Sequence, residues 1–254
     1  MSPRKKSTSD PCNKQVVVVC VQEPFEEGSA MDFGLIKGDD IRFLHQAFIT
    51  DTIMHALELG DTDVRLYYQN QPDRVRLVKI VMDYLKKKLS GELAERFEKQ
   101  LSTFPQKKDR WGIRIERAFK ECFDSGYDAV LLVGSRTPTV TSKMMRSAWN
   151  MLSQSDVIFG PTPEGRYYSI GMSGAYQIEL SAFDWTSPSI YADIAGAFTD
   201  KGLHWSELPI WYAVESSEEL EIMARDINQF RFEGDETTAR ETELVMERIL
   251  AKLS

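Results

Sequence analysis

Apolar and polar positions follow two patterns along the chain, which predict strands and helices in turn. Residues 15–21 (QVVVVCV) form an unbroken β-branched run, which is typical of a strand buried on both faces of a parallel sheet. Residues 41–59 instead carry apolar side chains at helical spacing and are followed by Gly60, a common C-cap residue. The other predicted strands are 64–68, 129–133, 157–159 and 166–172, and the other helices are two within 75–101, then 113–123 and segments from 142, from 191, from 218 and 237–253.

This alternation of strands and helices predicts the class of fold. Repeated strand–helix–strand units build a mostly parallel sheet covered by helices. We therefore expect an α/β fold of three layers, Rossmann-like, with a mostly parallel mixed sheet. In such a sheet the ligand site lies after the carboxyl ends of the strands. The loops of interest are then 22–32, 134–139 and 160–166.

The length of 254 residues and the hydrophobic content of 42% fit one domain with appendages. We expect a disordered tail at 1–14, the α/β domain at 15–232, and a helical segment at 233–254 that packs on the domain or on a partner. The apolar run at 16–21 is too short for a membrane span, and the tail lacks the apolar core of a secretion signal. The three cysteines are widely spaced and predict no disulfide framework. These features predict a cytoplasmic protein without a membrane span.

The charge of the chain is unevenly distributed. The net charge of −8 argues against a nucleic-acid partner. Residues 74–120 nevertheless hold 14 Lys and Arg against 6 Asp and Glu. This excess fits either an anionic ligand or the solvated face of a helix.

Three motifs mark the second half of the chain: residues 134–138 (GSRTP), 160–171 (GPTPEGRYYSIG) and 183–187 (FDWTS). In order and spacing they resemble a bacterial glycosyltransferase-like family that includes the arsenosugar-biosynthesis type. The similarity extends over about 15–227, and residues 106–114 (QKKDRWGIR) partly match a further motif of that family. The resemblance implies a GT-A fold that binds a nucleotide-diphospho-sugar and transfers its sugar to a small-molecule acceptor.

The resemblance also implies roles for individual residues. Glu164 stands where the family has an Asp and is the candidate base, and Glu215, from a later acidic motif, is the second catalytic candidate. The residues expected at the nucleotide and its phosphates are Gln22, Gln106, Arg110, Arg114, Gly134, Ser135, Arg136 and Arg166. Those expected in the substrate pocket are Gly165, Tyr167, Tyr168 and Trp185. These roles require the turns of Arg136 and Glu164 to face each other across one pocket.

Departures from the family pattern change the expected chemistry. Arg136 replaces the Asp that the resemblance implies would face a Mg²⁺ or Mn²⁺ ion, so an ordinary site for such an ion lacks its usual carboxylate. Arginine binds phosphate oxygens through a two-pronged guanidinium. Arg110, Arg114, Arg136 and Arg166 are therefore expected to form a phosphate clamp that needs no metal. Mg²⁺ or Mn²⁺ stays open as a cofactor, but no residues are assigned to a metal, and His45, His55 and His204 are too scattered to form such a site.

Two alternatives stay open beside the glycosyltransferase interpretation. The same departures fit a paralogue that has lost catalysis and keeps the fold for binding or as a scaffold. The helices of 75–101 would then form an oligomer face, as in a homodimer. A nucleotidylyltransferase shares the general fold type, but it ordinarily has a basic residue after a Gly-rich first loop, which 23–34 lacks.

Overall fold

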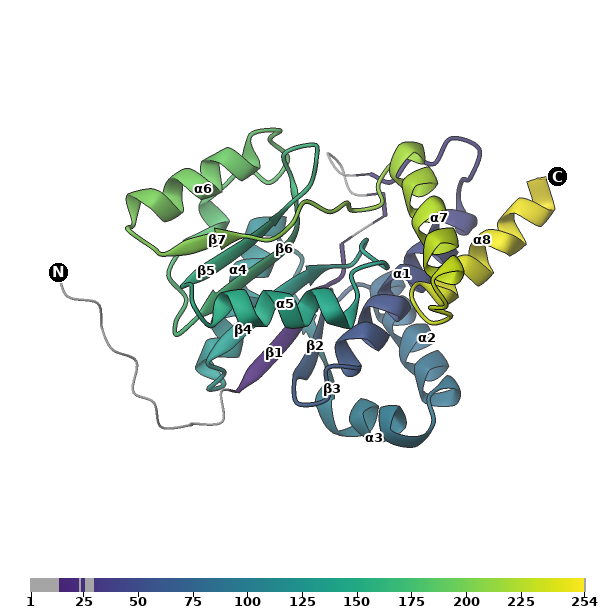
Figure 1. The fold of residues 1–254 in the computed structure, drawn as a ribbon, viewed down its shortest axis with the longest axis horizontal. Helices are drawn as coiled ribbons and strands as arrows, with labels where there is room; N and C mark the ends of the chain where they lie inside the picture. Colours follow the sequence, from purple (N-terminus) through teal and green to yellow (C-terminus); the bar gives the residue numbers. More distant parts are fainter. Residues whose placement is uncertain (1–13, 23, 26–29, 254) are drawn as a thin grey trace.

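A seven-stranded sheet forms the centre of the protein, seen as a computed structural model that describes residues 14–22, 24–25 and 30–253 (Figure 1). The strand order is β3-β2-β1-β4-β6-β5-β7. The strands are β1 Gln15–Cys20, β2 Asp63–Gln69, β3 Leu101–Gln106, β4 Ala129–Gly134, β5 Val157–Pro161, β6 Tyr167–Ser173 and β7 Trp205–Glu207. Only β6 runs against its neighbours β4 and β5 among these strands. The predicted α/β fold with a mostly parallel mixed sheet is confirmed.

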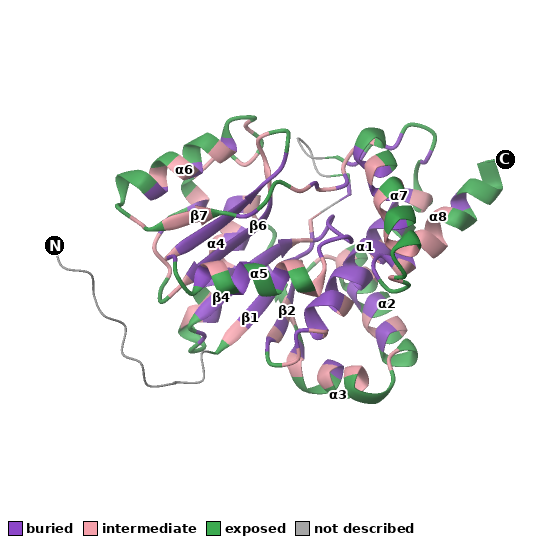
Figure 2. Cartoon of the chain, in the orientation of Figure 1, coloured by how far each residue is buried: buried purple, intermediate pink, exposed green. Residues whose placement is uncertain are grey.

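Strand β1 lies in the middle of the sheet because both of its faces are apolar. Val16 to Val19 are each 0% exposed. Val17 and Val19 contribute to one apolar core, while Val16 and Val18 contribute to the other on the opposite face. Figure 2 shows the buried strands between helices whose outer surfaces are exposed.

The described part of the chain has eight α-helices, six of which cover the sheet. They are α1 Asp39–Leu57, α2 Pro72–Lys88, α3 Gly91–Gln100, α4 Trp111–Asp124, α5 Ser142–Leu152, α6 Ile190–Asp200, α7 Ser217–Phe232 and α8 Arg240–Leu253. Helices α1, α2, α3 and α5 supply the core on one face, and α4 and α6 supply the core on the other. The molecule therefore has three layers, with α7 and α8 packed beside α1 in a separate apolar cluster. No helix in this described part combines the length and apolarity that a membrane crossing requires.

Three features differ from the sequence expectations. Strand β3 is not predicted because its sequence, LSTFPQ, follows α3 without a break and contains Pro105, which only an edge strand tolerates. Strand β7 is also missed, since it has three residues. Two side chains of the alternative oligomer face over 75–101 pack within this chain instead: Leu85 is 0% exposed in the core, and the Tyr84 hydroxyl donates to Glu241 of α8. The tail expected at 1–14 lies outside the described residues except for Lys14.

Candidate active site

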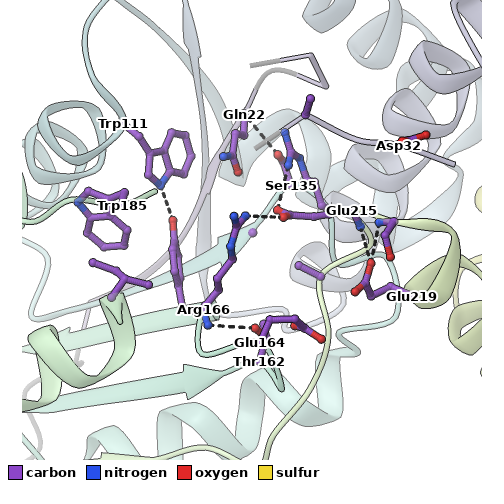
Figure 3. Close-up of a pocket in the computed structure, with 17 residues that line it drawn as sticks. Gln22, Asp32, Trp111, Ser135, Thr162, Glu164, Arg166, Trp185, Glu215 and Glu219 are labelled. Atoms are coloured by element: carbon purple, nitrogen blue, oxygen red, sulfur yellow. Dashed lines mark hydrogen bonds and ion pairs between the residues drawn. The ribbon is translucent and has the colours of Figure 1, made fainter. Parts of the chain in front are cut away.

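A cavity of about 330 Å³ opens at the carboxyl ends of β1 and β4. Gln22 borders it after β1, Gly134, Ser135 and Arg136 border it after β4, and the turn between β5 and β6 contributes further residues. That turn supplies Thr162, Glu164 and Arg166, and Tyr167 follows at the start of β6. The turns of Arg136 and Glu164 thus face one cavity, at the edge of the sheet where parallel strands end (Figure 3).

One carboxylate in this cavity joins two arginines. Arg136 Nη1 donates to Glu215 Oε1 at 2.9 Å, and Arg166 Nη1 donates to Glu215 Oε2 at 2.7 Å (Figure 3). Glu215 precedes α7, so the three residues come from three separate segments. The Arg136 side chain is 2% exposed, against 32% for Arg166 and 23% for Glu215. The buried guanidinium is thus reached from the cavity past two more exposed groups.

The turn that presents Arg166 depends on a glycine. Gly165 has a φ of +73°, in the left-handed region, and a Cβ there would lie 2.9 Å from the Pro188 carbonyl oxygen. Thr162 closes the turn: its backbone N–H donates to the Arg166 carbonyl at 3.1 Å, and its hydroxyl accepts from the Arg166 N–H at 3.2 Å. Gly165 shapes this turn and is not among the described residues that line the cavity.

The described charged groups of the cavity pair mainly with one another and with backbone N–H groups. Its described lining has two guanidiniums, from Arg136 and Arg166, and the carboxylates of Asp32, Glu164, Glu215 and Glu219. Both oxygens of Glu215 accept from guanidiniums, and Glu219 accepts from the Ser216 N–H in the capping box of α7. No group of three or more His, Cys, Asp or Glu side chains suited to a metal ion occurs in the described residues. Two of the four carboxylates in this described lining, Glu215 and Glu219, are thus already engaged by donors of the protein.

Three aromatic side chains form another wall of the cavity. Trp111 Nε1 donates to the Tyr167 hydroxyl, and the rings of Tyr167 and Trp185 meet edge to face with centroids 4.9 Å apart. Trp185 Nε1 donates to the Leu180 carbonyl at 2.8 Å, and the Arg114 guanidinium lies 5.1 Å from the Trp111 ring centroid. Burial raises the pKa of Tyr167 above its ordinary value of 10.0. These contacts hold the aromatic wall in one arrangement.

A second cavity of about 360 Å³ adjoins the first. The two share Gln22, Trp111 and Trp185, and the second also contains Arg110 and Asp184. Arg110 is the N-cap residue of α4 and is exposed. The two cavities therefore share a wall, with Arg136 in the first cavity and Arg110 in the second.

The arginines and glutamines expected at one phosphate site lie in different parts of the structure. Arg114 is 0% exposed, and its Nη2 donates to the Val21 carbonyl at 2.8 Å. Gln106 is also buried, and its Nε2 donates to the Arg114 carbonyl at 2.9 Å. These contacts join α4 to β1 and β3, which corrects the expectation that all four arginines share one clamp. Arg136 and Arg166 share the first cavity, and Arg110 lies in the second.

Tyr168 also lies apart from the first cavity's described lining. Its hydroxyl donates to the Pro209 carbonyl at 2.9 Å, and its ring packs against Gly160, where a Cβ would lie 2.7 Å from the ring. It therefore holds the segment after β7 onto the sheet. This position corrects the expectation that Tyr168 belongs to the substrate pocket.

Sequence reasoning missed the part that His45 plays in the site. His45, on α1, is buried, and its Nε2 lies 3.4 Å from the Ser135 hydroxyl oxygen, which also accepts the Gln22 N–H at 3.1 Å. Burial, and then the charge of Arg136, lower the pKa of His45 to about 3. His45 is thus a neutral support for the turn after β4. Spacing along the helix could not reveal this contact, because Ser135 is 90 residues away.

The fold and its cavities define a Rossmann-like α/β protein with a candidate ligand site at the strand ends. The chain belongs to the family described as "Uncharacterized protein conserved in bacteria (DUF2064)", whose profile matches residues 52–187. No curated protein matches it.

Solved structures share the fold. One, from Desulfovibrio desulfuricans G20, is described as a "putative nucleotide-diphospho-sugar transferase"; it is 21% identical, has a TM-score of 0.68, and the match covers 92% of this chain and 97% of that one. Another, a 4-diphosphocytidyl-2C-methyl-D-erythritol synthase from Anaerococcus prevotii DSM 20548, is 10% identical with a TM-score of 0.52, covering 86% and 97%. At these identities the similarity establishes the fold alone.

Proposed function

We propose that this protein is a glycosyltransferase that binds a nucleotide-diphospho-sugar and transfers the sugar to a small acceptor in the cytoplasm, without a divalent metal ion. One observation carries the proposal: Arg136 and Arg166 converge on a cavity at the carboxyl ends of β1 and β4. Two guanidiniums can bind the oxygens of a diphosphate and offset the charge that develops on it as it leaves. The motif similarity to the glycosyltransferase-like family, which includes the arsenosugar-biosynthesis type, supports the same donor class.

The two adjoining cavities suit a ligand with two parts. We place the diphosphate and sugar beside Arg136 and Arg166, and the nucleoside toward Arg110. Trp111 and Trp185 lie where the two cavities meet, and aromatic faces of this kind stack on bases and sugars. This orientation of the ligand follows from charge, because the diphosphate is its most negative group and Arg136 and Arg166 are the positive groups in the described lining of the first cavity.

Transfer also needs a base for the acceptor. Glu164 is exposed on a turn that borders the cavity, within reach of an acceptor that enters from solvent. We assign it the removal of the acceptor hydroxyl proton while that oxygen bonds to the sugar and the sugar–diphosphate bond breaks. The nucleoside diphosphate leaves with the electron pair, toward the guanidiniums.

The binding step is tested by isothermal titration of uridine and thymidine diphosphates, with and without chelator. We expect binding that the chelator does not change and that is weaker in Arg166→Ala by about tenfold or more, because a hydrogen bond to a charged group contributes about 1.5–3 kcal/mol. The control is Arg225→Ala, which removes an exposed arginine that pairs with Glu221 on the surface of α7. Binding that chelator abolishes, or no binding of either nucleotide, would contradict the proposal.

The charge pattern also favours a second candidate, a noncatalytic paralogue that binds a nucleotide-sugar. In it, Arg136 and Arg166 bind the diphosphate in place of Glu215, but no ion assists a leaving group. Such a protein would bind the nucleotides as above but release no nucleoside diphosphate from a panel of nucleotide sugars and acceptors. The third alternative, nucleotidylyl transfer, would release pyrophosphate from a nucleoside triphosphate, so the released product separates the three.

A further inference from the structure

Arg136 and Arg166 form an anion-binding site that the Glu215 side chain occupies. Each oxygen of the Glu215 carboxylate accepts from a different guanidinium, at 2.9 and 2.7 Å. Two oxygens of one diphosphate can accept from the same two donors, since guanidinium binds carboxylate and phosphate through the same fork of N–H groups. Glu215 therefore occupies the position that the proposed function gives to the ligand's diphosphate.

The burial of Arg136 favours an exchange of one anion for another at its guanidinium. Arg136 is 2% exposed, so a negative partner at its guanidinium offsets the desolvation of its charge. Glu215 and Arg166 are more exposed and border the cavity. An anion that enters from the cavity can replace the Glu215 carboxylate at both guanidiniums, and Arg136 then still has a negative partner.

The backbone around Glu215 is fixed on both sides, which confines such an exchange to the side chain. The Val214 N–H donates to the Arg136 carbonyl at 2.8 Å, and the Glu215 carbonyl accepts from the Asp32 N–H at 2.8 Å. Ser216 is the N-cap of α7, within a capping box that includes Glu219. Release of the carboxylate therefore needs a rotamer change of Glu215 and no movement of α7.

We propose that Glu215 is an internal competitor that mimics the diphosphate, and that it restricts the site to ligands with a diphosphate group. This inference rests on the proposed function. A diphosphate has more negative charge and more acceptor oxygens than the Glu215 carboxylate, so it can displace that carboxylate. A ligand with a single carboxylate has no more charge than Glu215 and does not displace it. Glu215 thus lowers the affinity of the site for every anion, and it excludes those that bind the two guanidiniums less strongly than a diphosphate does.

The test is calorimetric titration of inorganic pyrophosphate and of acetate into the full chain and into Glu215→Gln. We expect pyrophosphate to bind Glu215→Gln about tenfold more tightly than the unmodified protein, because the ion pairs with Glu215 no longer have to be broken first. Acetate should bind only the variant. Glu221→Gln removes an equal charge from the exposed face of α7 and should leave both affinities unchanged.

Further variants separate displacement from simple charge removal. Glu164→Gln removes a carboxylate from the same cavity lining but not from the arginine bridge, and should tighten pyrophosphate binding by less than about threefold. Glu215→Asp keeps the charge on a shorter side chain, so it should fold and bind with intermediate affinity. If Glu215→Gln melts at a lower temperature, pyrophosphate should raise its melting temperature more than that of the unmodified protein.

The failures of this inference and of the proposed function differ. Equal pyrophosphate affinity in the unmodified protein and Glu215→Gln, or an equal gain in Glu164→Gln, overturns the role of Glu215 and leaves the diphosphate site standing. The absence of pyrophosphate binding in every variant overturns the proposed function together with this inference.

Discussion

At the scale of single residues, the environment of each ionisable group decides what it can do. The replacement of an expected Asp by Arg136 is visible in the sequence, but its partner Glu215 is 79 residues further on, and only the fold brings them together. His45 gives a similar lesson. Its position on a predicted helix indicates nothing unusual, yet in the fold it lies buried beside Arg136 and Ser135 with a pKa of about 3.

His45 should make the protein sensitive to acid. Its folded pKa is lowered below the ordinary value of 6.5, so the folded state binds this proton less readily than the unfolded state. The free energy of unfolding should then fall as the pH falls below about 6.5, by up to about 1.4 kcal/mol per pH unit. Urea unfolding at pH 7.5 and 5.5 measures this loss, and His45→Gln should reduce it by about 1 kcal/mol.

His204 provides the control for this measurement, because its side chain is exposed. His204→Gln should keep the pH dependence of the unmodified protein. If His45→Gln loses as much stability between the two pH values as the unmodified protein, burial of a neutral His45 is not the cause.

At the scale of elements, α8 is fixed to α1 by a carboxylate at its first turn. Asp51, buried in α1, accepts from the backbone N–H of Glu241 at 3.1 Å, from the N–H of Thr242 at 2.9 Å and from the Thr242 hydroxyl at 2.7 Å. The two backbone donors are among the first N–H groups of α8, which have no partner within the helix. The sequence predicts α8 from its apolar spacing, but the residue that caps it is about 190 positions away.

Asp51→Ala should weaken the attachment of α8. Three buried donors lose their acceptor, and we expect the free energy of unfolding to fall by about 2 kcal/mol. Burial raises the pKa of Asp51 to about 6, so urea unfolding should be measured at pH 7.5, where the carboxylate is ionised. Asp83→Ala, at an exposed position on α2, is the control, with an expected change within about 0.5 kcal/mol. Equal stabilities of the two variants would contradict a capping role for Asp51.

At the scale of the whole molecule, the site lies where segments from both halves of the chain pack closely. Gly112, in the first turn of α4, makes one such contact: a Cβ there would lie 2.5 Å from Trp185 Nε1 and 2.7 Å from the Leu180 carbonyl oxygen. The aromatic wall between the two cavities is built on this close approach, since Trp111 and Trp185 belong to these two segments.

Gly112→Ala should therefore affect stability and binding together. The added methyl group forces α4 and residues 180–185 apart, at a cost of about 1–3 kcal/mol in urea unfolding, and should weaken nucleotide binding because both tryptophans move. Gly196→Ala is the matched control in α6, where a Cβ meets nothing within 4 Å and alanine favours the helix by up to about 1 kcal/mol. A Gly112→Ala protein as stable as Gly196→Ala would contradict the close contact of Gly112 with Trp185 and Leu180.

The sequence by itself determined the layered α/β plan, because burial on both faces of 15–21 and helical spacing elsewhere are local patterns that the backbone must obey. It also pointed to the turns of Arg136 and Glu164, since loops at strand ends are where such a sheet binds ligands. Only the tertiary structure decided that β6 runs antiparallel, that β3 and β7 form the edges, and that Arg114 lies inside while Arg136 and Arg166 share Glu215. These outcomes depend on the energies of contacts between residues far apart in the chain, and local sequence patterns do not determine those energies.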